Sequence, residues 1–86
     1  MKDDDEIERR TRELSPGAAA TLLSFTVGVA QPYPEVPFTP RLELFRAGLL
    51  IGGDTVPYKY QRVAGCHLHP LGIAVAQYIR EQDHEG

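Results

Sequence analysis

The sequence predicts a small α+β domain made of about three helices and a β-hairpin. Its 86 residues suffice for one domain only. Near the start, the middle and the end of the chain, a residue able to cap a helix is followed by proline, which is typical of helix starts. Between the second and third of these signals lies a segment rich in aromatic and β-branched residues, which is typical of strands.

The first 14 residues form a charged segment with six acids and four bases. Ile7 and Leu14, one heptad apart, are the apolar residues that give it a helical face. Acids at its start and arginines near its end suit the helix dipole. We therefore interpret residues 1–14 as a charged helical arm, with a disordered terminus as the alternative. Residues 15–82 form the predicted domain, and residues 83–86 are an acidic tail.

The first helix of the domain is predicted to begin at Pro16, with Ser15 as its N-cap. A run rich in alanine and leucine follows, and Gly28 and Pro32 are expected to end the helix. Residues 31–40 then contain four prolines, and each proline disfavours helix at the residue before it. This segment is therefore predicted to be an extended connection without a regular helix.

A second helix is predicted from Arg41 to Ala47, because Thr39 and Pro40 repeat the capping pattern. Gly48 follows as the residue that ends this helix in a left-handed conformation. The apolar face of the helix is expected at the spacing i, i+3 and i+7, which brings together Leu42, Phe45 and Leu49.

A β-hairpin is predicted after the second helix. Its first strand is Leu49–Ile51, its turn is Gly52–Asp54, and its second strand is Val56–Val63. Because side chains alternate along a strand, we expect Tyr58 and Tyr60 on one face of the ribbon.

The final helix gives the most regular periodic signal of the chain. It is predicted to begin at Pro70, with the imidazole of His69 as a weak cap, and to fade into the acidic tail after Gln82. Apolar residues recur along it at helical spacing: Leu71, Ala74, Val75, Tyr78 and Ile79.

Two short motifs frame the predicted hairpin: Ala-Gly-Leu-Leu at 47–50 and Leu-His-Pro-Leu-Gly at 68–72. Together with the order of the elements, they resemble a winged helix-turn-helix domain. In that family a recognition helix commonly ends in glycine and two apolar residues, a β-hairpin wing follows, and a motif similar to Leu-Thr-Pro-Leu-Gly opens the last helix. The resemblance implies a wing over residues 49–68 and a last helix over residues 70–82. It covers residues 39–82 well and residues 15–30 loosely.

The resemblance implies a regulator of transcription that binds double-stranded DNA. Its contacts are expected from the second helix and the wing, through Arg41, Arg46, Lys59 and Arg62. Residues 40–62 carry a net charge of +2, which is a modest footprint for a polyanion. Because four bases make few phosphate contacts, a homodimer is expected to double them.

A protein-binding adaptor or inhibitor without DNA binding, for example a phage-encoded one, is the alternative function. A helix-turn-helix usually has a short helix before its recognition helix, and here the proline-rich residues 31–39 stand in that place. The net charge of −3 also favours this alternative. Tyr33 and Phe38, both in the proline-rich strip, are the expected contact surface.

Catalytic, metal-binding and cofactor-binding classes have little support in this sequence. Because it has no nucleophile elbow, phosphate loop or paired carboxylates, we expect neither an enzyme nor a cofactor. Cys66, His67 and His69 are metal-ligating residue types, but a structural zinc site needs four ligands. We therefore expect no metal.

We expect a cytoplasmic protein with no membrane partner. The longest uncharged run, residues 14–34, is interrupted by prolines and cannot cross a bilayer as a helix. No apolar signal region follows the charged first residues. A single cysteine excludes an internal disulfide framework.

Overall fold

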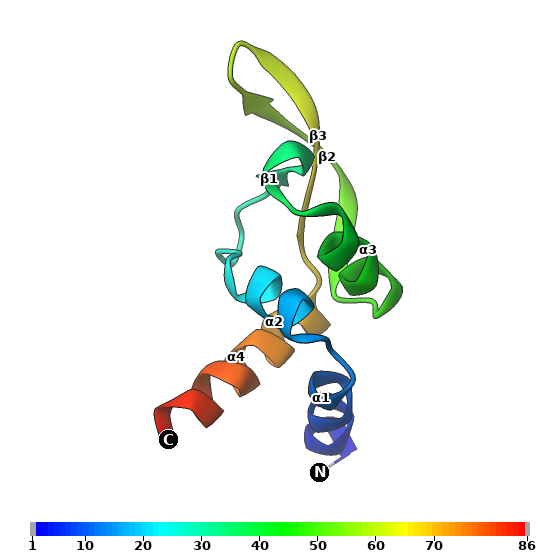
Figure 1. Ribbon diagram of the computed structural model, residues 1–86, viewed down its shortest axis with the longest axis vertical. Helices are drawn as coiled ribbons and strands as arrows, with labels where there is room; N and C mark the ends of the chain where they lie inside the picture. The colour runs from blue at the N-terminus through cyan, green and yellow to red at the C-terminus, as the bar shows by residue number, and fades with distance from the viewer. Residues whose placement is uncertain (1, 86) are drawn as a thin grey trace.

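The chain folds as a small α+β structure in which helices pack around the inner end of a long β-hairpin (Figure 1). The computed structural model describes the backbone of residues 2–85 and the side chains of residues 5–82. Within these residues the elements are, in chain order, α1 (Lys2–Arg12), α2 (Pro16–Leu23), β1 (Gln31–Pro32), the 3-10 turn η1 (Tyr33–Glu35), α3 (Phe38–Arg46), β2 (Leu50–Tyr58), β3 (Gln61–Leu68) and α4 (Pro70–Glu85). The predicted α+β class is confirmed, and this order is consistent with a winged-helix-like arrangement.

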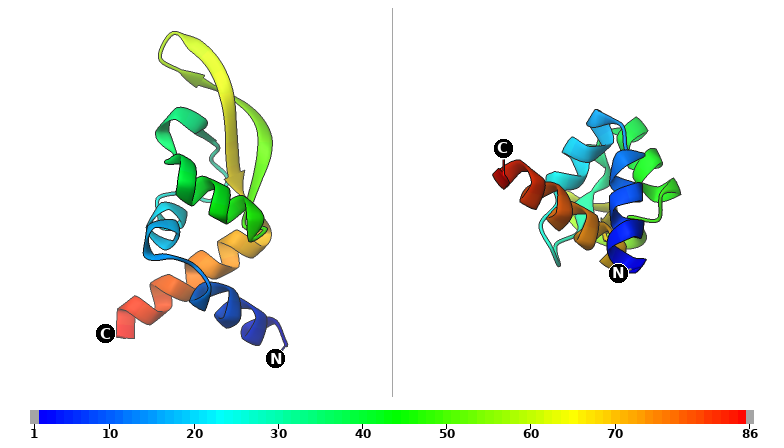
Figure 2. Two further views of the ribbon diagram at one scale, coloured as in Figure 1. Left: turned by 45° about the vertical axis from the view of Figure 1, so that its right-hand side comes forward. Right: turned by 90° about the horizontal axis from the view of Figure 1, so that it is seen from below.

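Three antiparallel strands form one sheet in the order β1-β3-β2. Strand β2 pairs with β3 from Leu50 opposite Leu68 to Tyr58 opposite Gln61. Strand β1 contributes only two residues, which pair with Gly65 and Cys66. The outer half of the hairpin is therefore a two-stranded ribbon, which extends beyond the helices along the 44 Å long axis of the molecule (Figure 2).

The hydrophobic core lies between α2, α3, α4 and the inner end of the sheet. Its buried apolar side chains are Ala18, Leu22, Phe25, Val36, Leu44, Leu49, Leu50, Cys66, Leu68, Val75 and Ala76. Because Leu50, Cys66 and Leu68 belong to this core, the hairpin is anchored at its base.

The backbone at the start of α4 lies in close contact with the backbone of Leu49. The backbone N–H of His69 donates to the carbonyl oxygen of Leu49 at 3.0 Å. His69 also caps α4, because its Nδ1 accepts a hydrogen bond from the N–H of Leu71 at 3.0 Å. A Cβ atom at Gly72 would collide with the same Leu49 carbonyl. The glycine of the Pro-Leu-Gly segment is therefore required for packing, since only a residue without a Cβ atom permits this close approach.

Helix α4 continues to Glu85, beyond the predicted end at Gln82. The backbone of Asp83 and Glu85, which the sequence assigns to an acidic tail, is thus helical. Neither α4 nor any other helix within residues 2–85 combines the length and the apolar character needed to cross a membrane.

The predicted start of α2 is confirmed, but its predicted end is wrong. Ser15 is the N-cap, and its Oγ accepts a hydrogen bond from the N–H of Ala18 at 3.1 Å. The helix ends at Leu23. Gly28, expected near the helix end, instead lies in a tight turn over residues 26–29 with a φ of 82°. A glycine that can serve a helix end serves a turn equally well, so its position alone does not fix the boundary.

The predicted start of α3 is also wrong, because the helix begins three residues earlier, at Phe38. Thr39 therefore lies inside the first turn and is not the cap; Pro37 occupies the cap position without a side-chain hydrogen bond. Pro40 is tolerated there, since backbone N–H groups in the first turn of a helix have no partner within the helix.

The buried face of α3 differs from the predicted one. Leu44 is fully buried, whereas Leu42 is 36% exposed and Phe45 is half-buried. Leu49 is buried, but it lies beyond Gly48, which ends the helix as predicted with a φ of 77°. Because the chain has left the helix at that point, Leu49 does not extend the face of Leu42.

The hairpin spans the predicted residues but turns at a different place. Lys59 and Tyr60 form the turn, and strand β2 includes Gly52–Asp54. In that segment Ile51 pairs with His67 and Asp54 with Gly65, so two glycines of β2 oppose one residue of β3. The Gly-Gly pair is therefore a β-bulge and not the turn. Tyr58 and Tyr60 do not share a face, because Tyr60 lies in the turn.

The charged N-terminal segment is a helix that docks on both α3 and α4. Ile7 packs against the core beside α4. The guanidinium of Arg10 donates to the carbonyl oxygen of Ala47, at the C-terminal end of α3. Along α1 itself, Glu6 pairs with Arg9 at 3.1 Å and with Arg10 at 2.9 Å. Such pairs stabilise an exposed helix only modestly, so the docking depends on Ile7 and Arg10.

Glu43 joins α3 to the start of α2. The backbone N–H of Ser15 donates to Glu43 Oε2 at 2.8 Å, and the Ser15 hydroxyl donates to Oε1 at 2.7 Å. These two hydrogen bonds hold the pKa of the Glu43 carboxyl below its ordinary value of 4.5, and the bond from the backbone N–H has the larger effect. The carboxylate form therefore favours the folded state.

Replacing this carboxyl is expected to change the pH dependence of stability. A group whose folded pKa is lowered contributes stability that is present above about pH 4.5 and is lost as pH falls through the lowered pKa. Glu43→Gln should therefore melt below the wild type at neutral pH, and this gap should close as the solution is acidified below that value. Thermal melts of both proteins in a pH series measure it, with Glu35→Gln as control. A gap that stays constant into the acid range would contradict the role of Glu43.

Candidate nucleic-acid interface

The four predicted contact bases do not form one continuous surface. Arg46 is exposed in the last turn of α3. Lys59 and Arg62 are exposed at the outer end of the hairpin. Arg41, by contrast, is half-buried at the other end of α3. The candidate interface therefore consists of the hairpin tip, with Arg46 apart from it at the end of α3, four residues before the base of the hairpin.

Arg41 has a structural role in place of the predicted outward one. Its Nη1 donates to the carbonyl oxygen of Tyr33 at 3.0 Å and to that of Val36 at 3.4 Å. Its guanidinium carbon lies 4.3 Å from the centre of the Tyr33 ring and 5.4 Å from that of the Phe38 ring. Arg41 therefore holds η1 against α3, and the expectation that it points outward is wrong.

The turn of the hairpin has an unusual backbone and exposed side chains. Lys59 has a φ of 57°, and it is the only residue other than glycine among residues 2–85 with a positive φ. Its Nζ lies 5.3 Å from the centre of the Tyr58 ring. Arg62 Nη2 donates to the carbonyl oxygen of Thr55 at 2.7 Å across the ribbon. Tyr60 is fully exposed.

Charge is separated along the long axis of the molecule. Residues 55–64, the outer part of the hairpin, contain two bases and no acid. Helix α1 contains five acids and four bases, and α4 contains three acids and one arginine, so both carry a small net negative charge. Both lie at the opposite end of the molecule (Figure 1). The overall net charge of −3 therefore hides a basic tip.

The outward face of α3 is largely apolar. Phe38 is 64% exposed and Leu42 is 36% exposed, and with Arg46 they repeat every four residues along one side of the helix. Tyr33, the other predicted protein contact, is half-buried with its ring edge-on to Phe45 at 6.3 Å. Of the predicted pair Tyr33 and Phe38, only Phe38 is exposed. The spacing of apolar residues places Leu42 on the buried face of the helix, so the sequence does not predict this exposed apolar face.

The sequence neighbours Cys66, His67 and His69 take three different environments. Cys66 is buried in the core, and this burial raises the pKa of its thiol. His67 places Nδ1 2.7 Å from Asp54 Oδ2, across the β-bulge. His69 caps α4. No three His, Cys, Asp or Glu side chains gather as metal ligands do, within the part of the chain whose side chains are described.

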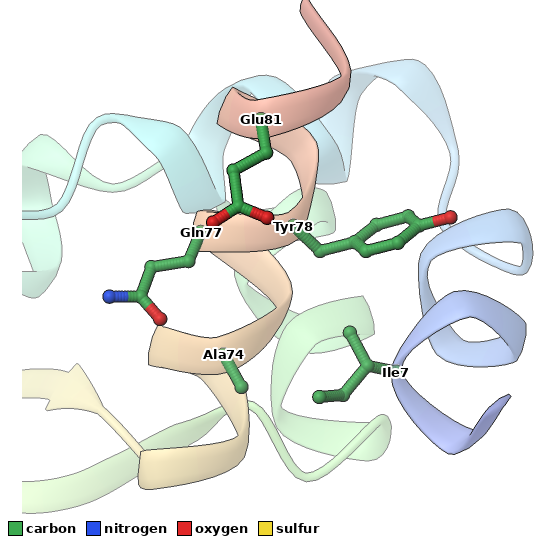
Figure 3. A pocket seen from close by; sticks show the side chains of 5 residues that line it. All are labelled: Ile7, Ala74, Gln77, Tyr78 and Glu81. Carbon is green, nitrogen blue, oxygen red and sulfur yellow. The ribbon is translucent and has the colours of Figure 1, made fainter. Parts of the chain in front are cut away.

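A hollow lies between α1 and α4, at the end of the molecule opposite the hairpin tip (Figure 3). It encloses about 160 Å³ and is lined by Ile7, Ala74, Gln77, Tyr78 and Glu81. Ile7 and Tyr78 both reach into the gap between the helices. Sites for drug-sized ligands usually enclose about 300–1,000 Å³, so this hollow is smaller than such sites. A neighbouring hollow between the same helices encloses about 310 Å³, at the lower end of that range, and is lined by Glu6, Ile7, Pro70, Leu71 and Ala74.

Comparison with known proteins found no family model, no curated protein and no solved structure that matches this chain. A function for it is therefore inferred from the positions and chemistry of its own residues.

Proposed function

We propose that this protein is a winged-helix DNA-binding regulator of transcription that acts as a dimer, with the hairpin as its main contact. The order of helix, short strand, helix, hairpin and helix supports this proposal, as does the pairing of the short strand with β3. Binding at a DNA site would regulate transcription by occupying that site, with the acidic helices turned away from the phosphates.

The basic tip of the hairpin is the observation that carries the proposal. Lys59 and Arg62 lie on a ribbon that extends beyond the core and contains no acid. Lys59 also occupies a left-handed position that costs roughly 1–2 kcal/mol for a residue other than glycine. Asparagine or glycine is usual in such turns. A lysine at a strained position is consistent with a functional role.

Dimerisation follows from the small number of bases. Lys59, Arg62 and Arg46 offer at most a few phosphate contacts per monomer, and each contact contributes only modestly at physiological salt. Two copies bound to neighbouring half-sites double that number. Light scattering of the free protein and of its DNA complex measures the number of copies.

The salt dependence of DNA binding tests the proposal. Wild-type protein should bind a labelled random duplex at low salt, with an affinity that falls steeply as salt rises, because bound counterions are released. The double variant Lys59→Gly/Arg62→Ala should bind at least about tenfold more weakly, with a salt slope reduced by about two per monomer. Fluorescence anisotropy over a salt series measures both quantities.

A matched control variant is Arg9→Ala/Arg12→Ala. It removes the same charge from α1, at the opposite end of the molecule, and should leave the DNA affinity nearly unchanged. Lys59→Gly should also raise the melting temperature, because glycine relieves the positive φ, so weaker binding cannot be attributed to unfolding. Equal losses in the two double variants would show that only net charge matters and would contradict binding through the hairpin.

The second candidate function is a protein-binding adaptor or inhibitor, and the apolar face of α3 favours it. Phe38 and Leu42 expose large apolar side chains that the core does not use, and exposed apolar patches often mark protein contacts. Absence of DNA binding at micromolar protein and low salt would favour this candidate over the first.

A further inference from the structure

The tip of the hairpin carries one large side chain that the fold does not use. Tyr60 is fully exposed and occupies the second position of the two-residue turn. The neighbouring Tyr58 is half-buried, and its ring lies beside the Lys59 ammonium. A tyrosine usually contributes to a fold by burying its ring. Tyr60 makes no such contribution, so its ring is free to contact a ligand.

The surroundings of the Tyr60 ring suit a nucleotide. Lys59 precedes it, and Arg62 follows two residues later. The hydrogen bond from Arg62 to the Thr55 carbonyl orients the guanidinium, while the side chain stays exposed. Tyr60 thus lies between two basic residues in the sequence of the tip, and this order suits a nucleotide strand, since bases stack on aromatic rings and phosphates pair with cations.

Building on the proposed function, we infer that Tyr60 stacks on an unpaired base, and that the protein binds DNA containing such a base more tightly than a continuous duplex. A ring stacks only on a base whose face is open, and the grooves of a continuous duplex present base edges instead. The ribbon extends beyond the helices (Figure 2), and Tyr60 lies in the turn at its outer end, where the helices do not block access to a strand.

Two labelled duplexes of the same sequence test the inference, one continuous and one with a single unpaired adenine. Wild-type protein should bind the second duplex more tightly. Tyr60→Ala should weaken binding to the second duplex by about 5- to 150-fold and leave binding to the continuous duplex nearly unchanged. Tyr60→Phe, which keeps the aromatic face, should bind like the wild type. Because Tyr60 is fully exposed, both variants should melt at the wild-type temperature.

A spectroscopic signal can locate the contact directly. The chain contains no tryptophan, so Tyr60→Trp introduces a single tryptophan at the tip, which can be excited separately from the remaining tyrosines. Its emission should be quenched by the duplex with the unpaired adenine, and acrylamide should reach it less readily in that complex. The continuous duplex should produce neither change.

Failure of this inference can be distinguished from failure of the proposed function. If wild type and Tyr60→Ala bind the two duplexes with equal affinities, the stacking contact is wrong while DNA binding stands. If Tyr60→Phe loses as much affinity as Tyr60→Ala, the hydroxyl makes the contact, and stacking is again excluded. If the wild type binds neither duplex at low salt, the proposed function and this inference are both overturned.

Discussion

Gly72→Ala is expected to destabilise the fold by at least about 3 kcal/mol, at the upper end of what overpacking usually costs. The added Cβ would collide with the carbonyl oxygen of Leu49, and that oxygen also accepts the hydrogen bond from His69 N–H. Relief requires α4 to move away from the core, where Val75 and Ala76 are buried. For a domain of this size the loss corresponds to a melting temperature lowered by at least about 12 °C. Thermal and urea unfolding followed by circular dichroism measure it.

Gly17→Ala is the matched control, because Gly17 is also a helical glycine. A Cβ atom at Gly17 would meet Pro40 only at 3.9 Å, an ordinary contact. Alanine is the better helix former, so this change should stabilise the protein by roughly 0.5–1 kcal/mol. The same substitution is thus expected to act in opposite directions at the two sites. If the free energy of unfolding of Gly72→Ala lies within about 1 kcal/mol of the wild-type value, α4 does not approach Leu49 as closely as the structure shows.

Leu44→Ala is expected to cost about 3–4 kcal/mol, whereas Leu42→Ala should cost less than about 1 kcal/mol. Leu44 is fully buried in the core, and its truncation leaves a cavity. Leu42 is 36% exposed on the outward face of the same helix. Urea unfolding of the two variants measures the difference, and equal slopes of the two transitions would show that only stability has changed.

This pair of variants tests which face of α3 is buried. The spacing of Leu42, Phe45 and Leu49 predicts that Leu42 faces the core, and in that case its truncation would be the costly one. A larger loss for Leu42→Ala than for Leu44→Ala would therefore favour the sequence pattern over the structure. It would also remove the apolar outward face on which the protein-binding alternative depends.

The two ends of the molecule have separate roles in the proposed function. The core and the close contact at Gly72 fix the base of the hairpin, so substitutions there should affect stability first. Lys59, Tyr60 and Arg62 lie beyond the core, and substitutions there should affect binding with little loss of stability. This separation makes the binding experiments interpretable, because their variants are expected to remain folded.

The sequence by itself determined the elements whose signals are local. Ser15 and His69 accept hydrogen bonds from the first turns of α2 and α4, and proline follows each of them. Gly48 ends α3 with a positive φ, as glycine readily does. A cap, a proline or a left-handed glycine acts within a few residues, so the α+β class and the order of the four helices and the hairpin could be predicted from the chain alone. Strand β1, the turn η1 and the start of α3 lie in residues 31–40, which the sequence predicts to be an extended connection without a regular helix, and this part of the prediction is wrong.

Only the tertiary structure decided the turn of the hairpin, the buried face of α3 and the position of Arg41. The Gly-Gly pair became a bulge because both flanking segments of β2 pair with β3. Leu44 replaced Leu42 in the core, and Arg41 turned toward the carbonyls of Tyr33 and Val36. Each outcome depends on contacts between residues that are not local to one turn or one helix. Glycine and leucine spacing is compatible with more than one such arrangement, and the packing of the whole chain selects among them.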